Sequence, residues 1–253
     1  MEKKVSIIMN CKNGQTFLRN SISSVIRQTY KNWELIFFDN FSKDKSIEIA
    51  KTFNDKRIKI LKAKKSLKLY DARNEALKFA KGKYITFLDT DDFWNSKKLK
   101  TQIDFLKKNN LKFCYSNLNL KFKNKKNLFI KKDKDHLRST QSLLKNYDIG
   151  ILTVMVEKKL FSYKRFNKQF EIIGDFDLFI RLSEITLIGY INKCLATYRI
   201  HNYNLSRRKK NIHIKELDFW IKKNKSRLKN MGLSIRSIKI NLLKLRIQNL
   251  INF

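Results

Sequence analysis

The sequence predicts an α/β fold in which a mostly parallel central sheet is flanked by helices. Short apolar runs rich in β-branched residues alternate, in the first half of the chain, with segments whose apolar residues recur at helical spacing. Acids follow directly on two of these runs, at Asp39 and Asp89. In parallel sheets of this kind, ligands bind beyond the carboxyl ends of the strands. With 42% apolar residues, the 253-residue chain has ample material for a packed core.

The first half divides into four expected strands and three expected helices. The strands are the apolar runs at residues 5–11, 33–38, 57–61 and 84–88. The helices are the segments with helical apolar spacing at residues 16–28, 44–53 and 69–80. Gly82 follows the third helix, as is common just after a helix end.

The second half is less regular. Residues 97–109 are expected as a helix, and residues 112–115 and 118–122 as two strands joined by Ser116-Asn117. The basic segment 121–134 is expected as a solvated loop or hairpin, residues 151–156 as a strand, and residues 177–183 as the opening of a helix. The last segment predicts a tail of two basic amphipathic helices. We therefore expect a domain at 1–205, with halves 1–115 and 116–205, and a helical tail at 206–253.

Composition excludes several classes of protein. The three cysteines are far apart and form no C-x-x-C pair, which argues against a zinc site or a disulfide framework and favours small core residues. No apolar run approaches the roughly 18–20 residues of a membrane span, and the amino terminus lacks a signal-peptide pattern. We therefore expect a cytoplasmic protein. A net charge of 57 − 22 = +35 would suit a nucleic-acid binder, but no helix-turn-helix, zinc-finger or RNA-recognition pattern is found.

An acidic cluster carries the strongest local signal. Asp89, Asp91 and Asp92 stand within four positions at the end of an expected strand. Like charges so close together repel each other, and a divalent cation relieves the repulsion. Carboxylates are ligands that Mg²⁺ and Mn²⁺ prefer. The cluster therefore predicts a metal site, and the alternative is a helix amino terminus, where acids are favoured by the helix dipole.

The order of several segments adds a resemblance. The chain contains VSIIMNCKNG at residue 5, QTYKNWE at residue 28, FDNFSKD at residue 38, DARNEA at residue 71 and GKYITFLDTDD at residue 82, and later GDFDLFIRL at residue 174 and YRIH at residue 198. This series resembles the family 2 glycosyltransferases, inverting enzymes with the GT-A nucleotide-sugar fold. The resemblance is close over residues 5 to about 115 and resumes at the two later segments.

The resemblance implies roles for individual residues. Asp175 matches the general base, and Asp91 the direct metal ligand of the D-x-D motif. The residues that match donor-binding positions are Asn13, Asp39, Arg73, Asp89 and His201. Three of these have structural alternatives: a turn for Asp39, a surface helix position for Arg73 and a satisfied loop histidine for His201. Gly174 departs from the pattern, since an acid frequently precedes the base.

The expected reaction is transfer of a sugar from a UDP-linked donor to a glycan or lipid-linked acceptor with inversion, in cell-envelope polysaccharide synthesis, with Mn²⁺ or Mg²⁺ as cofactor. Alternatives are a nucleic-acid-binding protein and a non-catalytic nucleotide-sugar binder. The basic tail predicts docking on the anionic inner face of the cytoplasmic membrane. The other interpretation of the tail is that Leu217, Trp220 and Leu242 pack on the catalytic domain or on a second subunit, and a homodimer remains open.

Overall fold

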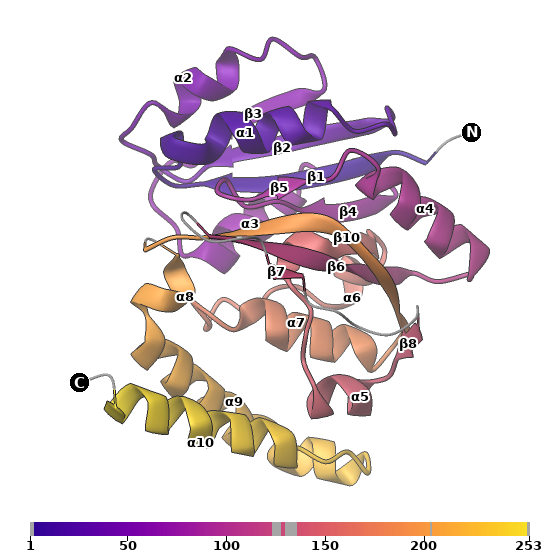
Figure 1. The fold of residues 1–253 in the computed structure, drawn as a ribbon, viewed down its shortest axis with the longest axis vertical. Helices are drawn as coiled ribbons and strands as arrows, with labels where there is room; N and C mark the ends of the chain where they lie inside the picture. Colours follow the sequence, from indigo (N-terminus) through magenta and orange to yellow (C-terminus); the bar gives the residue numbers. More distant parts are fainter. Residues whose placement is uncertain (1–2, 123–127, 130–135, 203, 252–253) are drawn as a thin grey trace.

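A computed structural model describes residues 3–122, 128–129, 136–202 and 204–251. A twisted sheet runs through the middle of the molecule, with helices on both faces and two long helices at the carboxyl-terminal end (Figure 1). The main path of the sheet has the order β3-β2-β1-β4-β9-β6-β10-β5, while β7 pairs with β6 and β8 with β10. The predicted α/β architecture is confirmed.

The first half forms the parallel part of the sheet. Its strands are β1 (Val5–Cys11), β2 (Trp33–Asp39), β3 (Ile58–Lys62) and β4 (Tyr84–Phe87). Adjacent strands of this group all pair in parallel, and Cys11 lies opposite Asp39 at the carboxyl end of the β1–β2 pair. The intervening helices are α1 (Gln15–Ile26), α2 (Ser46–Lys51) and α3 (Leu69–Leu77). All seven expected elements are present, with ends shifted by a few residues at most.

The second half contains β5 (Phe93–Trp94), α4 (Lys98–Lys108), β6 (Phe113–Phe122), β7 (Leu128–Phe129), β8 (His136–Arg138), α5 (Thr140–Lys145), the 3-10 turn η1 (Ile151–Thr153), β9 (Val154–Glu157), α6 (Leu160–Tyr163), α7 (Gly174–Ser183) and β10 (Ile188–Ile200). β9 runs antiparallel to both β4 and β6, and β6 pairs in parallel with β10. β10 thereby returns the chain to the loop that follows β4.

Several expectations for this half were wrong in detail. The two strands predicted at 112–122 form one strand, β6, because the chain passes Ser116-Asn117 without turning and a register irregularity in β10 absorbs the mismatch. The strand predicted at 151–156 begins as a 3-10 turn, since the Thr153 hydroxyl and backbone N–H both donate to the Gly150 carbonyl. The helix predicted from residue 177 begins at Gly174. Of the segment 121–134, β6 and β7 hold the described residues, and the rest lies outside them.

Two apolar cores lie on opposite faces of the sheet because successive strand residues point to opposite sides. Ile7 belongs to the core that includes residues of α1, α2 and α4, whereas Ile8 belongs to the core that includes residues of α3, α5, α7 and the carboxyl-terminal helices. The cysteines are all free: Cys11 and Cys114 are buried, and Cys194 is half-buried in β10.

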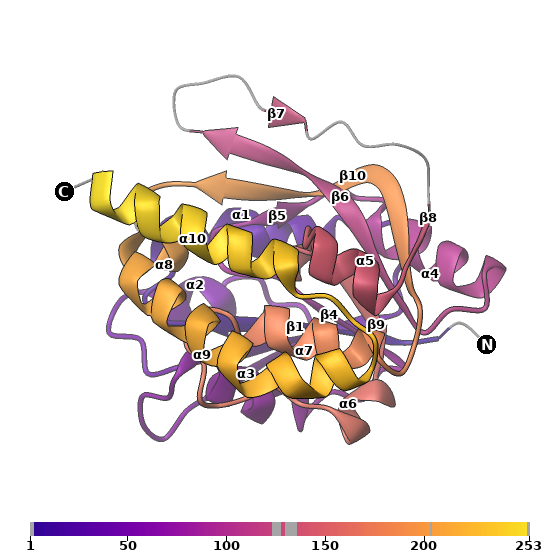
Figure 2. The same cartoon turned by 90° about the horizontal axis from the view of Figure 1, so that it is seen from below.

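The tail consists of α8 (Leu205–Arg208), α9 (Lys210–Asn230) and α10 (Arg236–Ile251). Its two long helices lie side by side across the α5–α7 side of the molecule (Figure 2). Leu217, Trp220 and Leu242 are buried in the same core as α3 and α7. The interpretation that these three residues pack on the rest of the chain is therefore correct. Within the described residues, no helix combines the length and the apolar character needed to span a bilayer.

Candidate functional site

The loops that follow β1, β2 and β4 meet at the carboxyl edge of the parallel strands. A Cβ atom on Gly14 would lie 2.7 Å from the Thr90 hydroxyl oxygen, so the first and third loops are in direct contact. Ser21 on α1 holds the third loop: its hydroxyl oxygen lies 2.7 Å from the Thr90 carbonyl and 2.6 Å from the Asp92 carbonyl, and its one proton is donated to either of them. The sheet thus brings together acids that are 50 residues apart in the sequence, as the strand-end pattern predicted.

Asn13 ties the first loop to the second. Its backbone lies in the left-handed region, with φ at 55°. Its amide oxygen accepts from the Lys43 backbone N–H (2.8 Å), and its own backbone N–H donates to the Ser42 hydroxyl (2.9 Å). An asparagine adopts this backbone conformation more readily than most residues. In the structure Asn13 therefore positions the loop. Its direct contact with a nucleotide-sugar donor stays a prediction.

Asp39 presents an unused acceptor at the end of β2. The residue is buried, and its Oδ2 accepts from the Ser42 backbone N–H at 3.1 Å. Its Oδ1 is also buried, and among the described residues no hydrogen-bond donor meets it. A buried acceptor normally has a partner, because an unmade hydrogen bond costs about 1–3 kcal/mol. A ligand N–H would satisfy Asp39.

Arg73 links the acidic loop after β4 to the region of Asp175. It lies on α3, is almost fully buried, and donates from Nη2 to Asp89 Oδ1 at 2.8 Å. Burial works against its charge, but the electrostatic influence of Asp89, followed by that of Tyr70 and Asp175, outweighs burial and raises the pKa of Arg73. Arg73 is therefore an internal cation placed between two carboxylates, and not a surface helix residue.

Asp91 contacts the carboxyl-terminal end of β10 and the segment after it. Its Oδ2 lies 2.9 Å from His201 Nε2 and 3.4 Å from Asn204 Nδ2. Burial and the charge of Asp89 raise the pKa of Asp91, and the bond with His201 opposes that rise. Asp91 and His201 were both predicted, and the long return of β10 brings them together.

The residues around Asp91 suit a cation that is shared with a substrate. In the described part of the chain, no group of three or more His, Cys, Asp and Glu side chains is arranged so that it could hold a metal ion. Mg²⁺ is commonly bound by one or two carboxylates plus substrate phosphates and water, and Mn²⁺ also accepts imidazole and carboxylate. Asp91, which is repelled by Asp89 and bonded to His201, could supply one carboxylate to a cation bound in that way.

Asp92 has a structural role. The alternative of a helix amino terminus at the acidic cluster is wrong, because β5 follows Asp92 and the next helix, α4, begins only at Lys98. The buried Asp92 carboxylate instead accepts from the Arg199 backbone N–H at 2.8 Å. Burial, followed by the charges of Asp91 and Asp89, raises the pKa of Asp92. Asp92 therefore anchors β10 to the acidic loop.

Asp175 lies in the first turn of α7 and contacts α3 through Tyr70. The Tyr70 hydroxyl oxygen is 3.2 Å from Asp175 Oδ1 and 2.8 Å from the Ile172 carbonyl, so its single proton can serve only one of them at a time. Burial raises the pKa of Asp175, and Arg73 works in the opposite direction. A carboxylate with a raised pKa is better suited to accept a proton near neutral pH. Tyr70 was not identified from the sequence, because nothing local links residue 70 to residue 175.

A cavity of about 610 Å³ has Asp175 in its wall. Its walls come from the end of α5 and the residues after it, the start of α7, and the tail helices α9 and α10. Sequence reasoning missed this cavity because four separate segments form it. The sequence predicted that the tail docks on the membrane, and it predicted no role for the tail in the site.

The fold and the acidic loop define the GT-A class of nucleotide-sugar transferases. The sequence profile of glycosyl transferase family 2 matches residues 6–174, and the chain belongs to this family. It is thus a glycosyltransferase, as the resemblance implied. The fold matches the crystal structure of S. aureus TarS 1–349 in complex with UDP-GlcNAc, with a TM-score of 0.69 and 17% identity over 86% of this chain and 66% of that one.

Two curated relatives are similar over most of their length. The chain is 36% identical to the Escherichia coli UDP-Glc:alpha-D-GlcNAc-diphosphoundecaprenol beta-1,3-glucosyltransferase WfgD, over 81% of this chain and 80% of the relative. It is 30% identical to the putative teichuronic acid biosynthesis glycosyltransferase TuaG of Bacillus subtilis, over 81% and 82%. The first name gives a UDP-glucose donor and a diphosphoundecaprenol-linked acceptor, and the second gives teichuronic acid biosynthesis.

Proposed function

We propose that the chain transfers a hexose from a UDP-linked donor to a hydroxyl of a lipid-linked glycan, with inversion, in cell-envelope polysaccharide synthesis. The observation that carries the proposal is a continuous set of contacts from Asp89 through Arg73 and Tyr70 to Asp175. It connects the nucleotide-side acids with a carboxylate suited to act as a base. The similarity to WfgD makes UDP-glucose the first donor to test and a diphosphate-linked N-acetylglucosamine the first acceptor.

The proposed mechanism is a single displacement. The acceptor hydroxyl attacks the anomeric carbon, a new carbon–oxygen bond forms, and the bond to the nucleoside diphosphate breaks on the opposite face. Asp175 takes the hydroxyl proton as the attack proceeds. Asp39 accepts a hydrogen bond from the nucleobase of the donor through its unused Oδ1, and N3–H of uracil fits this acceptor.

We also propose that the enzyme uses Mn²⁺ or Mg²⁺, with Asp91 as a direct ligand and His201 beside it. When bound, such a cation supplies positive charge to the departing diphosphate. Arg73, held against Asp89, adds fixed positive charge at the same edge of the sheet.

We further propose that the enzyme is cytoplasmic and lies on the inner face of the cytoplasmic membrane. In this proposal residues 1–205 form the transferase domain, with a nucleotide half at 1–115 and an acceptor half at 116–205. Residues 206–253 form the tail that docks on the membrane. One face of α10 supports this. Ile240, Leu243, Ile247 and Leu250 follow at helical spacing and are all exposed. Lysines and arginines flank this stripe. Such a helix suits an anionic interface.

The test is turnover and donor binding of Asp175→Asn. We expect binding of UDP-glucose, measured by calorimetry, to stay within a few-fold of the parent, and transfer to fall by about 100-fold or more, because the amide keeps the shape but cannot accept the proton. Asp91→Ala is the comparison: its donor binding should lose the response to added Mn²⁺. Collapse of donor binding in Asp175→Asn would place the base elsewhere, and a parent that binds donor without any transfer or hydrolysis would indicate a non-catalytic binder.

A further inference from the structure

The cavity beside Asp175 has no role in the proposed contacts to the donor. It lies between the end of α5, the first turn of α7 and the tail helices, and these elements are adjacent in both views (Figures 1 and 2). Its volume of about 610 Å³ is within the range of sites that enclose small ligands. Asp175 forms part of its wall, so a ligand in the cavity would meet the proposed base.

A second polar group in the cavity wall lacks a partner in the protein. The Tyr147 hydroxyl is buried, and no hydrogen-bond partner for it exists among the described residues. The Tyr147 ring is fixed edge-on against Phe176, with ring centroids 4.9 Å apart. Burial first, and then the charge of Asp175, raise the pKa of Tyr147, and both residues line the same cavity. A sugar hydroxyl can bond to both groups, which is the recognition expected for an acceptor sugar.

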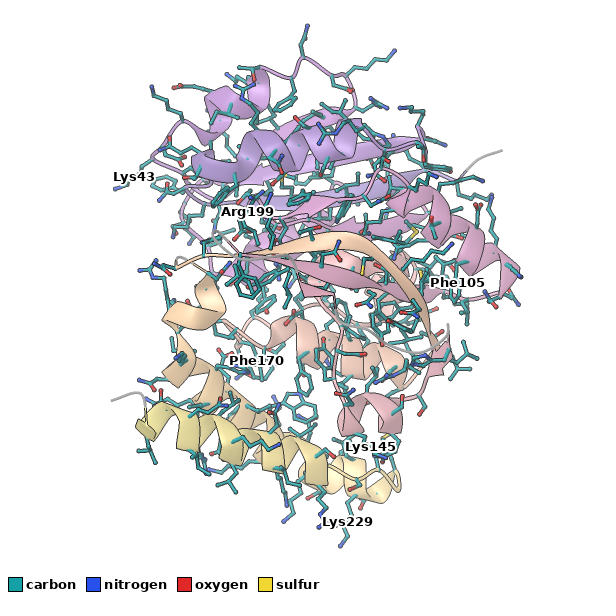
Figure 3. The ribbon with its side chains drawn as sticks, in the orientation of Figure 1. Lys43, Phe105, Lys145, Phe170, Arg199 and Lys229 are labelled. Carbon is teal, nitrogen blue, oxygen red and sulfur yellow. The ribbon has the colours of Figure 1, made fainter. Side chains whose placement is uncertain are left out.

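The charge at the cavity suits an anionic ligand. Among the residues that line it, the acid is Asp175 and the cations are Lys145 and Lys244, with His213 as a further hydrogen-bonding group. Lys145 ends α5 and projects next to the tail helices (Figure 3), while Lys244 comes from α10. Both lysines are exposed and approach the cavity from different elements. Two ammonium groups placed in this way can bind phosphate oxygens.

The rim of the cavity continues into the apolar stripe of α10. Ile240 lines the cavity and is 44% exposed, and Leu243 and Ile247 follow it along the same helix. The wall and rim of the cavity therefore combine the proposed base, two cations and an exposed apolar surface. A lipid-linked sugar diphosphate carries a matching set of groups: a sugar, a diphosphate and a lipid.

We infer that this cavity binds the acceptor, with the sugar at Asp175 and Tyr147 and the diphosphate at Lys145 and Lys244, and that the tail is therefore part of the active site. The inference rests on the proposed function, which supplies the lipid-linked acceptor. It adds the place where the acceptor binds and the residues that select a phosphate-bearing one.

The test uses the full chain with Lys145→Gln and Lys244→Gln combined. The matched control is Lys225→Gln with Lys229→Gln, two exposed lysines of α9 that do not line the cavity. We expect the KM for a short-chain lipid diphosphate N-acetylglucosamine to rise by about tenfold or more, since two charged hydrogen bonds are lost. The KM for UDP-glucose and the KM for an acceptor without the diphosphate should stay unchanged, and so should every parameter of the control.

A binding measurement separates this inference from the proposed function. Calorimetric binding of a short-chain prenyl diphosphate should be detectable in the parent and the control, and lost in the double variant, whether or not any transfer occurs. Absence of binding in the parent, or equal binding in the double variant, overturns the inference. A short-chain anionic phospholipid that binds as tightly as the prenyl diphosphate also overturns it, because the cavity would then bind lipid headgroups. Failure of the proposed function would instead appear as a parent that binds the prenyl diphosphate and transfers nothing.

Discussion

Lys98 is the most unusual single residue in the core. It lies on α4 and is fully buried, and its ammonium nitrogen contacts Thr86 Oγ1 (3.0 Å), Gln102 Oε1 (2.6 Å) and the ring of Trp94 (4.2 Å to the centroid). These contacts orient the Lys98 ammonium group but do not fully replace the hydration that it has in water. Burial consequently lowers the pKa of Lys98 from its ordinary 10.5 to about 7.

This shift predicts how stability changes with pH. Above pH 7 the folded chain releases the Lys98 proton while the unfolded chain keeps it up to about pH 10.5, so the stability contributed by this site rises with pH in that window. The limiting slope for one proton is about 1.4 kcal/mol per pH unit. We expect Lys98→Met to remove this rise, as measured by urea unfolding at pH 7.0, 7.75 and 8.5. Lys100→Met, at an exposed lysine of the same helix, is the control. Parallel pH profiles for the parent and Lys98→Met would show that Lys98 keeps an ordinary pKa.

At the scale of elements, the packing of α3 against α7 positions the proposed base. A Cβ atom on Gly174 would lie 2.5 Å from two atoms of the Tyr70 ring, so no side chain fits at residue 174 without moving Tyr70. This explains why Gly174 departs from the acid that is frequent before the base. The Tyr70 ring occupies the space that a side chain at residue 174 would need, and the Tyr70 hydroxyl contacts Ile172 and Asp175.

Gly174→Ala should therefore disturb the site through Tyr70. We expect a loss of about 1–3 kcal/mol in the free energy of unfolding, typical of overpacking, and a fall in kcat that exceeds any change in donor KM. Gly150→Ala serves as the control, because its Cβ would lie 3.1 Å from a flexible leucine end away from Asp175. Adding Tyr70→Leu to Gly174→Ala should restore stability but not kcat. Unchanged kcat in Gly174→Ala would mean that Tyr70 does not position Asp175.

The elements differ in how well the sequence predicts them, and the reason is physical. β1 and β2 are buried on both faces, so each is mostly apolar, with Ser6 and Asn10 as the polar residues within β1 and Glu34 within β2. Lys12 after β1 and Asp39 in β2 mark where the apolar residues stop. β10 has thirteen residues, but exposed Asn192 and Lys193 interrupt its pattern, and its register with β6 shifts at Cys194. The acids at strand ends were therefore predictable as a group. The contacts of Asp91 with His201 and of Asp175 with Tyr70 depend on chain returns of about a hundred residues, for which no local signal exists.

At the scale of the whole molecule, the tail is both part of the core and an outer surface. Trp220 is fully buried and donates from its indole nitrogen to Asp177 Oδ1 at 3.0 Å. The Glu216 carboxylate accepts from the backbone N–H groups of Glu171, Ile172 and Ile173, just before the proposed base. Removal of the tail would expose this core to solvent. It would also remove the contacts of Trp220 and Glu216 that hold the start of α7. A truncated chain therefore cannot test membrane docking, and the outer stripe of α10 must be changed in the full chain.

Leu243→Ser with Ile247→Ser should weaken binding to vesicles that contain anionic phospholipid. Both residues are exposed, so the fold should survive, and each buried aliphatic side chain contributes about 1.5–3 kcal/mol at an apolar interface. We expect flotation of the parent at low salt and a loss of at least about 100-fold in partition for the double variant. Phe219→Ser with Met231→Ser, which removes two exposed apolar residues of the tail outside the stripe, should float like the parent. Equal flotation of all three proteins would contradict docking through α10, while light scattering that shows a dimer in the parent and a monomer in the double variant would assign the stripe to a second copy of the chain.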